Sequence, residues 1–446
     1  MFRTAAVIFS ALSFPGAVSA SEPVVELAPV ERHFPELNEL LGVAAETSPR
    51  MLEEALRLEE ARDEAGIARA ARYPSVRGTG RLISRYEERS DLDSGRDGFL
   101  PQATLTLRQP LYHWGALRAE DRIGRIRGEL ASHNGAEAFR LLALEVRSRY
   151  LRLALDGLEL EVAERRRELA DREWRAGRRM LERGEIEETE VRDLVLALEE
   201  AELAVERLMA ERDRSRRTLA RLVGYDPARE WEGPGEIPSL ETGGLREGNG
   251  NVSVDRLRPP FLEAADHRVR EAERRREAER SRARPNLDFV AGVSQDQVAV
   301  LDRRDIDRTI FFAGVEVNWN IFDGFEARSR RAASSTRLRL EERRRGRLET
   351  EWRHDLEDLE SRVRFREREM SVADKRLALA EESLERARAD FEAGRLSAID
   401  LARREVLYAE RRFAAGEKRA AYLMARAELV SESGRDPAVL RFVRNR

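Results

Sequence analysis

The side chains that most often do chemistry in enzymes are scarce in this chain and lie far apart along it. There is no cysteine, which excludes disulfides, thiolate metal sites, cysteine nucleophiles and a lipid anchor on an N-terminal cysteine. We find no Ser/His/Asp set, no phosphate-binding loop and no paired carboxylates outside helix faces. The sequence therefore predicts no enzyme, no cofactor and no metal site. The five histidines include no pair at ligand spacing: His33, His113, His133, His267 and His354.

Charge is the chemistry that the chain does carry. Charged residues make up 37% of its 446 residues and aromatic residues only 6%, a balance typical of long helices with large solvated faces. The net charge is −4, so no nucleic-acid partner is expected. The elements that position acids and arginines therefore matter more than any single reactive group.

Residues 1–20 have the features of a secretory signal peptide. Arg3 supplies the positive end, residues 5–18 are apolar and small, and Val18-Ser19-Ala20 fits the rule for cleavage after Ala20. A proline and a glycine interrupt this segment, which is already too short to span a bilayer. No other apolar run approaches 18 residues. If the chain crosses a membrane, it must therefore do so with strands.

The chain is internally duplicated. Residues 112–228 align without a gap on residues 322–438, at a constant offset of 210. Glycine and proline matches carry the most weight, because they fall where helical periodicity stops. We therefore expect two similar structural units. The matched pairs are Gly184 with Gly394, Glu190 with Asp400, Gly224 with Gly434 and, at an offset of 211, Pro74 with Pro285.

Each unit is predicted to have the same order of elements. A helix of about 25 residues, two strands, a helix of about 67 residues and a helix of about 37 residues follow one another. At 1.5 Å per residue the long helix would measure about 100 Å, and the two shorter helices stacked end to end would nearly match it. The expected ranges are 48–73, 116–182, 260–284 and 326–392, with tight turns at Gly184 and Gly394.

A narrow stripe of apolar and small residues with 4-3 spacing runs along these helices, which indicates a coiled-coil seam. The remaining faces are rich in arginine and glutamate, so they face water. The helices alone fit a solvated coiled coil with no pore equally well. The stripe includes Leu142, Val146, Tyr150 and Leu153 on the long helix, and Leu194, Leu198, Val205 and Leu208 on the descending one.

Between the helices the apolar period changes to 2, which predicts four strands of about 10–13 residues, long enough to cross a bilayer at a tilt. In 75–86 apolar residues and glycines alternate with Arg77 and Arg81; in 311–321 they alternate with polar residues that include Glu316. The charged segments 88–98 and 295–307 are expected to be loops.

Four strands cannot close on themselves, and their edges would stay unpaired. A soluble sandwich would need a covering layer, which the long polar helices do not supply. Four strands from each of three chains would give a 12-stranded antiparallel barrel with Arg77, Arg81 and Glu316 facing a polar lumen. The predicted fold is a mixed α/β membrane protein, a trimeric β-barrel continued by a long α-helical coiled-coil barrel.

Several short motifs, in the same order in both units, resemble the TolC-type outer-membrane efflux and secretion channel family. They lead from strand to long helix, from first helix to strand, and around the second tip. The resemblance covers nearly all of the mature chain. The motifs are Gln109-Pro110-Leu111-Tyr112, Trp319-Asn320-Ile321-Phe322-Asp323-Gly324, Tyr73-Pro74, Arg284-Pro285 and Gly394-Arg395-Leu396-Ser397-Ala398-Ile399-Asp400-Leu401.

The resemblance implies a homotrimer in the cell outer membrane, with a periplasmic helical tunnel that docks a periplasmic adaptor and an inner-membrane transporter. The adaptor contact would be Gly394, Leu396 and Ser397, and more loosely Gly184 and Ile186. The first tip has an acid, Glu187, where the hydroxyl residue is expected. The cargo stays open among drugs, metal ions and polypeptides, and so does the choice between efflux and type I secretion.

The same resemblance places an acidic ring of the periplasmic entrance at Asp400, and a second acid one turn later is replaced by Arg403. Asp400 also fits a local role, because Ser397-x-x-Asp400 is a capping box. Asp400, Arg403 and Glu190 are candidates for salt-bridge latches that open on docking.

The alternative function is a periplasmic coiled-coil adaptor or a structural protein without a pore. Adaptors have one helical hairpin, and the duplication with paired strands argues against that class. The expected divisions are a signal peptide (1–20), an N-terminal periplasmic segment (21–47), two repeats (48–224 and 259–434), an equatorial linker (225–258) and a short C-terminal tail (435–446).

Overall fold

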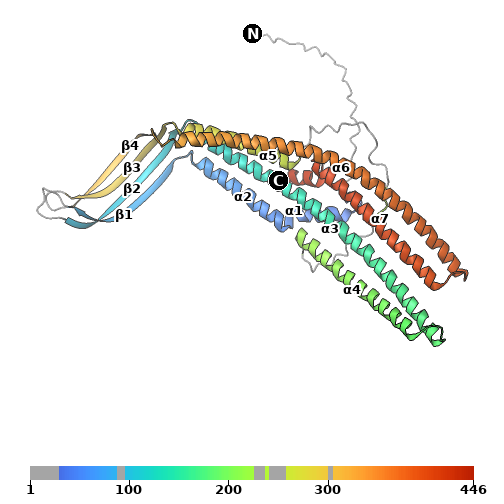
Figure 1. The fold of residues 1–446 in the computed structure, drawn as a ribbon. Helices are drawn as coiled ribbons and strands as arrows, with labels where there is room; N and C mark the ends of the chain where they lie inside the picture. The colour runs from blue at the N-terminus through green and yellow to red at the C-terminus, as the bar shows by residue number, and fades with distance from the viewer. Residues whose placement is uncertain (1–29, 88–95, 226–236, 241–257, 300–304, 446) are drawn as a thin grey trace, which may run out of the picture.

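The computed structural model describes residues 30–87, 96–225, 237–240, 258–299 and 305–445. It is elongated, with a sheet at one end that continues into a rod of helices (Figure 1). The expected signal peptide and most of the linker 225–258 lie outside the described residues. The first unit contains α2 (Pro49–Ala70), β1 (Ser75–Glu87), β2 (Arg96–Tyr112), α3 (Ala116–Glu182) and α4 (Glu188–Val223), preceded by a short turn (Val30–Arg32) and α1 (Pro35–Thr47). The second contains α5 (Pro260–Arg282), β3 (Asn286–Ala299), β4 (Asp305–Asn318), α6 (Glu326–Glu392) and α7 (Ala398–Glu432), followed by α8 (Pro437–Arg444).

The two long helices begin and end at the predicted residues, and each has 67 residues. Each ends at a glycine with positive φ, Gly184 at 75° and Gly394 at 71°. The amide of the residue after each glycine donates a hydrogen bond back to the last turn of the helix. The Glu185 amide donates to the Met180 carbonyl at 2.9 Å, and the Arg395 amide donates to the Asp390 carbonyl at 2.8 Å. This C-terminal cap satisfies carbonyls that would otherwise lack a partner. No described helix is apolar over enough length to span a membrane.

The shorter helices stack end to end, as predicted. Both α2 and α4 pack along α3, and both α5 and α7 pack along α3 and α6. The stacking depends on Gly224, whose φ is 86° and where a Cβ atom would lie 2.2 Å from the Thr47 carbonyl oxygen, just before α2. Gly434 similarly lies against Arg258, just before α5. Any side chain at Gly224 would therefore force the two helix ends apart.

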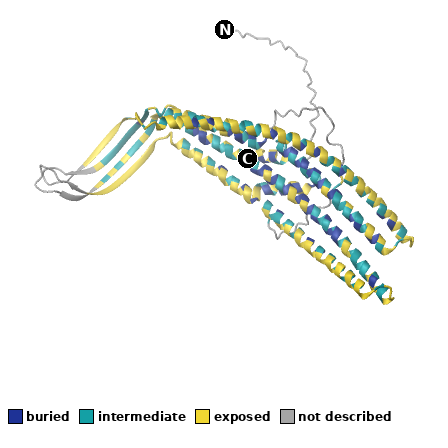
Figure 2. Cartoon of the chain, in the orientation of Figure 1, coloured by how far each residue is buried: buried dark blue, intermediate teal, exposed yellow. Residues whose placement is uncertain are grey.

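The core lies midway along the rod (Figure 2). The predicted seam residues Leu142, Val146 and Tyr150 on α3 are almost completely buried there. Residues 435–446, expected as a tail, contain α8, whose Phe442 ring stacks on Phe139 at 4.5 Å between centroids. Helix α1 packs beside it and buries Leu37, Leu40, Leu41 and Ala44.

The four strands form one antiparallel sheet in the order β1-β2-β3-β4. Its register places the predicted apolar positions on one face, with Val76 opposite Leu107, Leu105 opposite Val293 and Ala291 opposite Ala313. Polar residues gather on the other face. Neighbours in β4 show the contrast, because Phe311 on the apolar face is 80% exposed and Phe312 on the other face 39%. Within the described chain, β1 and β4 each have one unpaired edge.

The strand ends differ from the prediction. Strand pairing continues into the charged segments expected as loops, from Gln295 opposite Thr309 to Ala299 opposite Asp305. Backbone hydrogen bonds form the ladder, so charged side chains do not end it. At the other end β4 stops at Asn318, opposite the first residue of β3. Trp319 and Ile321, predicted within the strand, therefore lie in the connection to α6.

Candidate functional site

The second tip, between α6 and α7, is held by local hydrogen bonds. The Ser397 hydroxyl accepts a hydrogen bond from the Asp400 amide at 3.1 Å and donates one to the Asp400 carboxylate at 2.7 Å. Ser397 is thus the N-cap of α7, as predicted, and its hydroxyl rather than its amide donates to the Asp400 carboxylate. Gly394 and Ser397 are exposed, whereas Leu396 packs against Leu384 and Leu401 inside the hairpin. Of the adaptor-contact candidates at this tip, Leu396 therefore packs inside the hairpin and supports the tip.

Arginines and glutamates tie the tip end of α7 to α3. Arg403 reaches Asp400 at 3.4 Å and Glu173 at 2.9 Å. Arg172, next to Glu173 on α3, donates to the Ala398 carbonyl at 3.2 Å. Further links continue along the two helices, Arg166 with Glu410 at 2.7 Å and Arg412 with Glu161 at 2.8 Å. The two hairpins of one chain are therefore joined by a ladder of ion pairs that includes one gate candidate, Arg403.

The first tip has the same backbone but a different charge. Glu187 replaces the N-cap serine and Glu190 completes a capping box, with its carboxylate accepting from the Glu187 amide at 3.4 Å. Ile186 occupies the position of Leu396 and is also partly buried. Glu190 is thus engaged in its own helix cap. Arg403, another latch candidate, is paired with Glu173 on α3.

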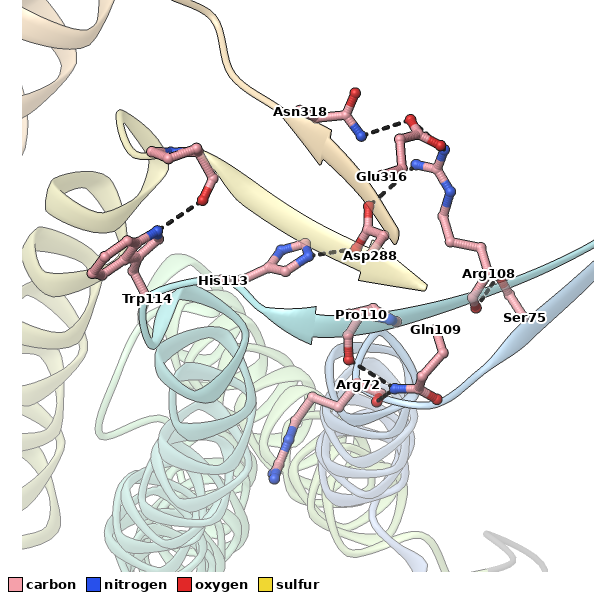
Figure 3. A network of polar contacts seen from close by, with 11 residues as sticks. Arg72, Ser75, Arg108, Gln109, Pro110, His113, Trp114, Asp288, Glu316 and Asn318 are labelled. Carbon is pink, nitrogen blue, oxygen red and sulfur yellow. Dashed lines mark hydrogen bonds and ion pairs between the residues drawn. The ribbon is translucent and has the colours of Figure 1, made fainter. Parts of the chain in front are cut away.

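Polar side chains also gather where the sheet meets the helices (Figure 3). The Asp288 side chain is buried and lies 2.7 Å from His113 Nε2 and 3.5 Å from Arg108. Arg108 also reaches Glu316 at 3.1 Å. The Trp114 indole donates to the Pro285 carbonyl at 2.7 Å. The network therefore joins β2, β3 and β4 to the start of α3.

Glu316, predicted to face the lumen, is part of this network, and the register places it on the same face as Arg77 and Arg81. Arg108 and Asp288 were not among the residues predicted for a site. Arg108 was visible as a charge on the polar face of its strand. Asp288 had one signal, a lone acid between Leu287 and Phe289 at the start of a strand.

Comparison with known proteins agrees with this architecture. The family model described as outer membrane efflux protein matches residues 40–225 and 254–435, one match for each repeat. A search among curated proteins gives no significant match.

Three solved structures share the fold over most of their length. The CmeC outer membrane channel of Campylobacter jejuni has a TM-score of 0.73 and 12% identity, over 92% of this chain and 88% of CmeC. The MtrE outer membrane channel of Neisseria gonorrhoeae, solved in its open state, has a TM-score of 0.69 and 17% identity, over 90% of this chain and 89% of MtrE. The outer membrane protein VceC of Vibrio cholerae has a TM-score of 0.67 and 16% identity, over 91% of this chain and 97% of VceC. With both repeats matched by the family model and the TolC-type fold present along the chain, this protein belongs to the outer membrane efflux protein family.

Proposed function

We propose that the chain is the outer-membrane exit duct of a tripartite efflux or type I secretion system. The observation that carries the proposal is the four-stranded sheet, which has one exposed apolar face, two free edges and a direct connection to the long helices. Pairing β4 of one chain with β1 of the next in a ring of three would close a 12-stranded barrel. Arg77, Arg81 and Glu316 would then line its lumen.

Exposed aromatic residues support a membrane boundary at the junction between sheet and helices. Aromatic residues form girdles at both bilayer interfaces of membrane barrels, and tyrosine and tryptophan suit this position because their apolar rings carry one polar group. The helices would then lie in the periplasm, with their tips toward an adaptor and an inner-membrane transporter. The exposed residues at the junction are Tyr112, Trp114, Trp319, Phe322 and Phe325.

The architecture is tested on the full-length protein extracted from outer membranes in detergent. We expect a particle with three times the mass of the chain, and ion conductance after reconstitution into planar bilayers. A monomeric periplasmic protein without conductance would contradict the duct and favour the structural alternative.

The ladder between α3 and α7 supports Arg403 as a latch, with Glu173 as its partner across the hairpins. Widening the entrance would require α7 to move away from α3, so these pairs would oppose opening. Arg403 also lies 3.4 Å from Asp400 and offsets its charge. A ring of three Asp400 side chains would therefore attract cations less than an unaccompanied acidic ring.

Replacing Arg403 by glutamine is expected to raise both the open probability and the cation selectivity in planar bilayers. An exposed pair contributes about 0.2–1 kcal/mol, and three chains that open together multiply its effect, so we expect an increase of about threefold or more. The matched control is Arg395→Gln, which removes the same charge but only a pair with Asp390 beside the same tip. Equal conductance changes in the two variants would contradict the latch.

A further inference from the structure

Two histidines that are far apart in the sequence stack on each other in the half of the rod nearer the sheet. His133 on α3 and His267 on α5 have ring centroids 4.9 Å apart and an interplanar angle of 29°. The two helices run antiparallel, because the Ser281 hydroxyl at the end of α5 donates to the Trp114 carbonyl just before α3. Each histidine has a glutamate four residues earlier on its own helix, Glu129 and Glu263. An i, i+4 spacing places both side chains on one helix face.

The four side chains meet at the interface between the two repeats. Ligand atoms of His133, Glu263 and His267 all lie within 4.8 Å of one another. A carboxylate oxygen of Glu129 lies 3.2 Å from His267 Nδ1. His267 is only 6% exposed, and because the contact with Glu129 does not have hydrogen-bond geometry, its Nδ1 atom has no hydrogen-bond partner. A buried nitrogen left without a partner costs about 1–3 kcal/mol, so its position calls for a ligand.

The types of side chain in the cluster also favour a cation. Two imidazoles with nearby carboxylates suit borderline divalent ions such as zinc, whereas soft ions prefer thiolate and thioether ligands.

We infer that His133, His267 and Glu263, with Glu129 as a fourth ligand, bind a divalent transition-metal ion that clamps α3 to α5. Ligand atoms on zinc at about 2.0–2.1 Å lie closer together than 4.8 Å, so the side chains would draw in around the ion. The clamp would join the first repeat to the second about 26 Å from the start of α3, counting 1.5 Å per residue. It would stiffen the rod without contributing to the tips.

Zinc binding to the untagged full-length protein, measured by equilibrium dialysis and elemental analysis, tests the inference. We expect one tightly bound zinc ion per chain and a rise in thermal stability on adding zinc. Cobalt in its place should give the intense visible bands of a four-coordinate N/O site. His133→Gln and His267→Gln are each expected to weaken binding at least about tenfold, since even the loss of a group supporting a ligand costs that much. Glu263→Gln should also weaken zinc binding. Weaker binding in Glu129→Gln indicates a four-ligand site, and wild-type affinity in Glu129→Gln indicates a three-ligand site.

The matched control is His354→Gln, because His354 is exposed on α6 and far from the cluster in the sequence. It should leave zinc binding unchanged. Each variant is first checked for wild-type helical content and particle size, so that loss of binding is not loss of fold. Less than one equivalent of zinc bound to the wild type, or wild-type affinity in the His133→Gln, His267→Gln double variant, would overturn the inference.

Discussion

Replacing Ala313 by arginine is expected to prevent most of the protein from assembling in the outer membrane, whereas the same change at the next residue, Gly314, is expected to be tolerated. Ala313 lies on the apolar face of β4, opposite Ala291, and Gly314 lies on the polar face. Ala313 is five residues from Asn318, which at the rise and tilt of a barrel strand is about 12 Å, near the middle of an apolar band about 25 Å tall. An arginine facing lipid at that depth costs about 2–4 kcal/mol.

The comparison is well matched, because both substitutions add the same side chain to a small residue on the same strand. A Cβ atom at Gly314 would meet no other atom within 4 Å. The measurement is the fraction of chain recovered as trimer from outer membranes, followed by urea unfolding in lipid vesicles. Equal losses in both variants, or a larger loss for Gly314→Arg, would mean that the apolar face does not contact lipid.

Removing the charge of Arg147 is expected to destabilise the helical rod by about 3–5 kcal/mol, because its buried partners would be left as uncompensated charges. Arg147 is 2% exposed and Asp436 is 1% exposed, and two hydrogen bonds of 2.6 and 2.9 Å join them. Glu31 also contacts Arg147, at 2.6 Å. These acids raise the pKa of Arg147 and keep it charged although it is buried. The network fastens both ends of the described chain to α3.

The test uses Arg147→Met, Asp436→Asn and the double variant in a cycle of unfolding free energies. Asparagine keeps a side-chain oxygen that can still cap α8, as Asp436 does for the Ala438 amide at 3.0 Å. We expect the double variant to lose less than the sum of the single losses. The matched control is Arg149→Met on the same helix. Arg149 forms an exposed pair with Glu145 at 3.6 Å, which should contribute no more than about 1 kcal/mol. A loss of that size for Arg147→Met would show that solvent reaches the network.

The long helices and the repeat could be predicted from the sequence, because their signals are local. Gly184 and Gly394 stand where the helical periodicity stops, and each adopts positive φ just after the end of its long helix. The alternation of side chains also predicted correctly which face of each strand is apolar. The strand ends could not be predicted as well, since the pairing of β3 with β4 depends on the backbone of the partner and continues through charged residues.

Contacts between distant segments were beyond the reach of the sequence. His133 and His267 are not at ligand spacing along the chain, and only the antiparallel packing of α3 on α5 brings them together. Arg147 and Asp436 are 289 residues apart. Helix α8 was not predicted for the same reason, because its short apolar face packs against a distant residue, Phe139. At the tips, the capping role of Ser397 was predictable from four residues, whereas the partner of Arg403 on α3 was not.

The free edges of β1 and β4 have a genetic consequence. In the proposed ring, each chain completes its sheet only with strands from its two neighbours, so one defective copy damages a barrel that also contains two sound chains. A variant such as Ala313→Arg, co-expressed at an equal level with the wild type, would leave about one barrel in eight free of defective chains if subunits mix at random. Its effect should therefore be dominant, and export capacity in such a cell should fall far below half.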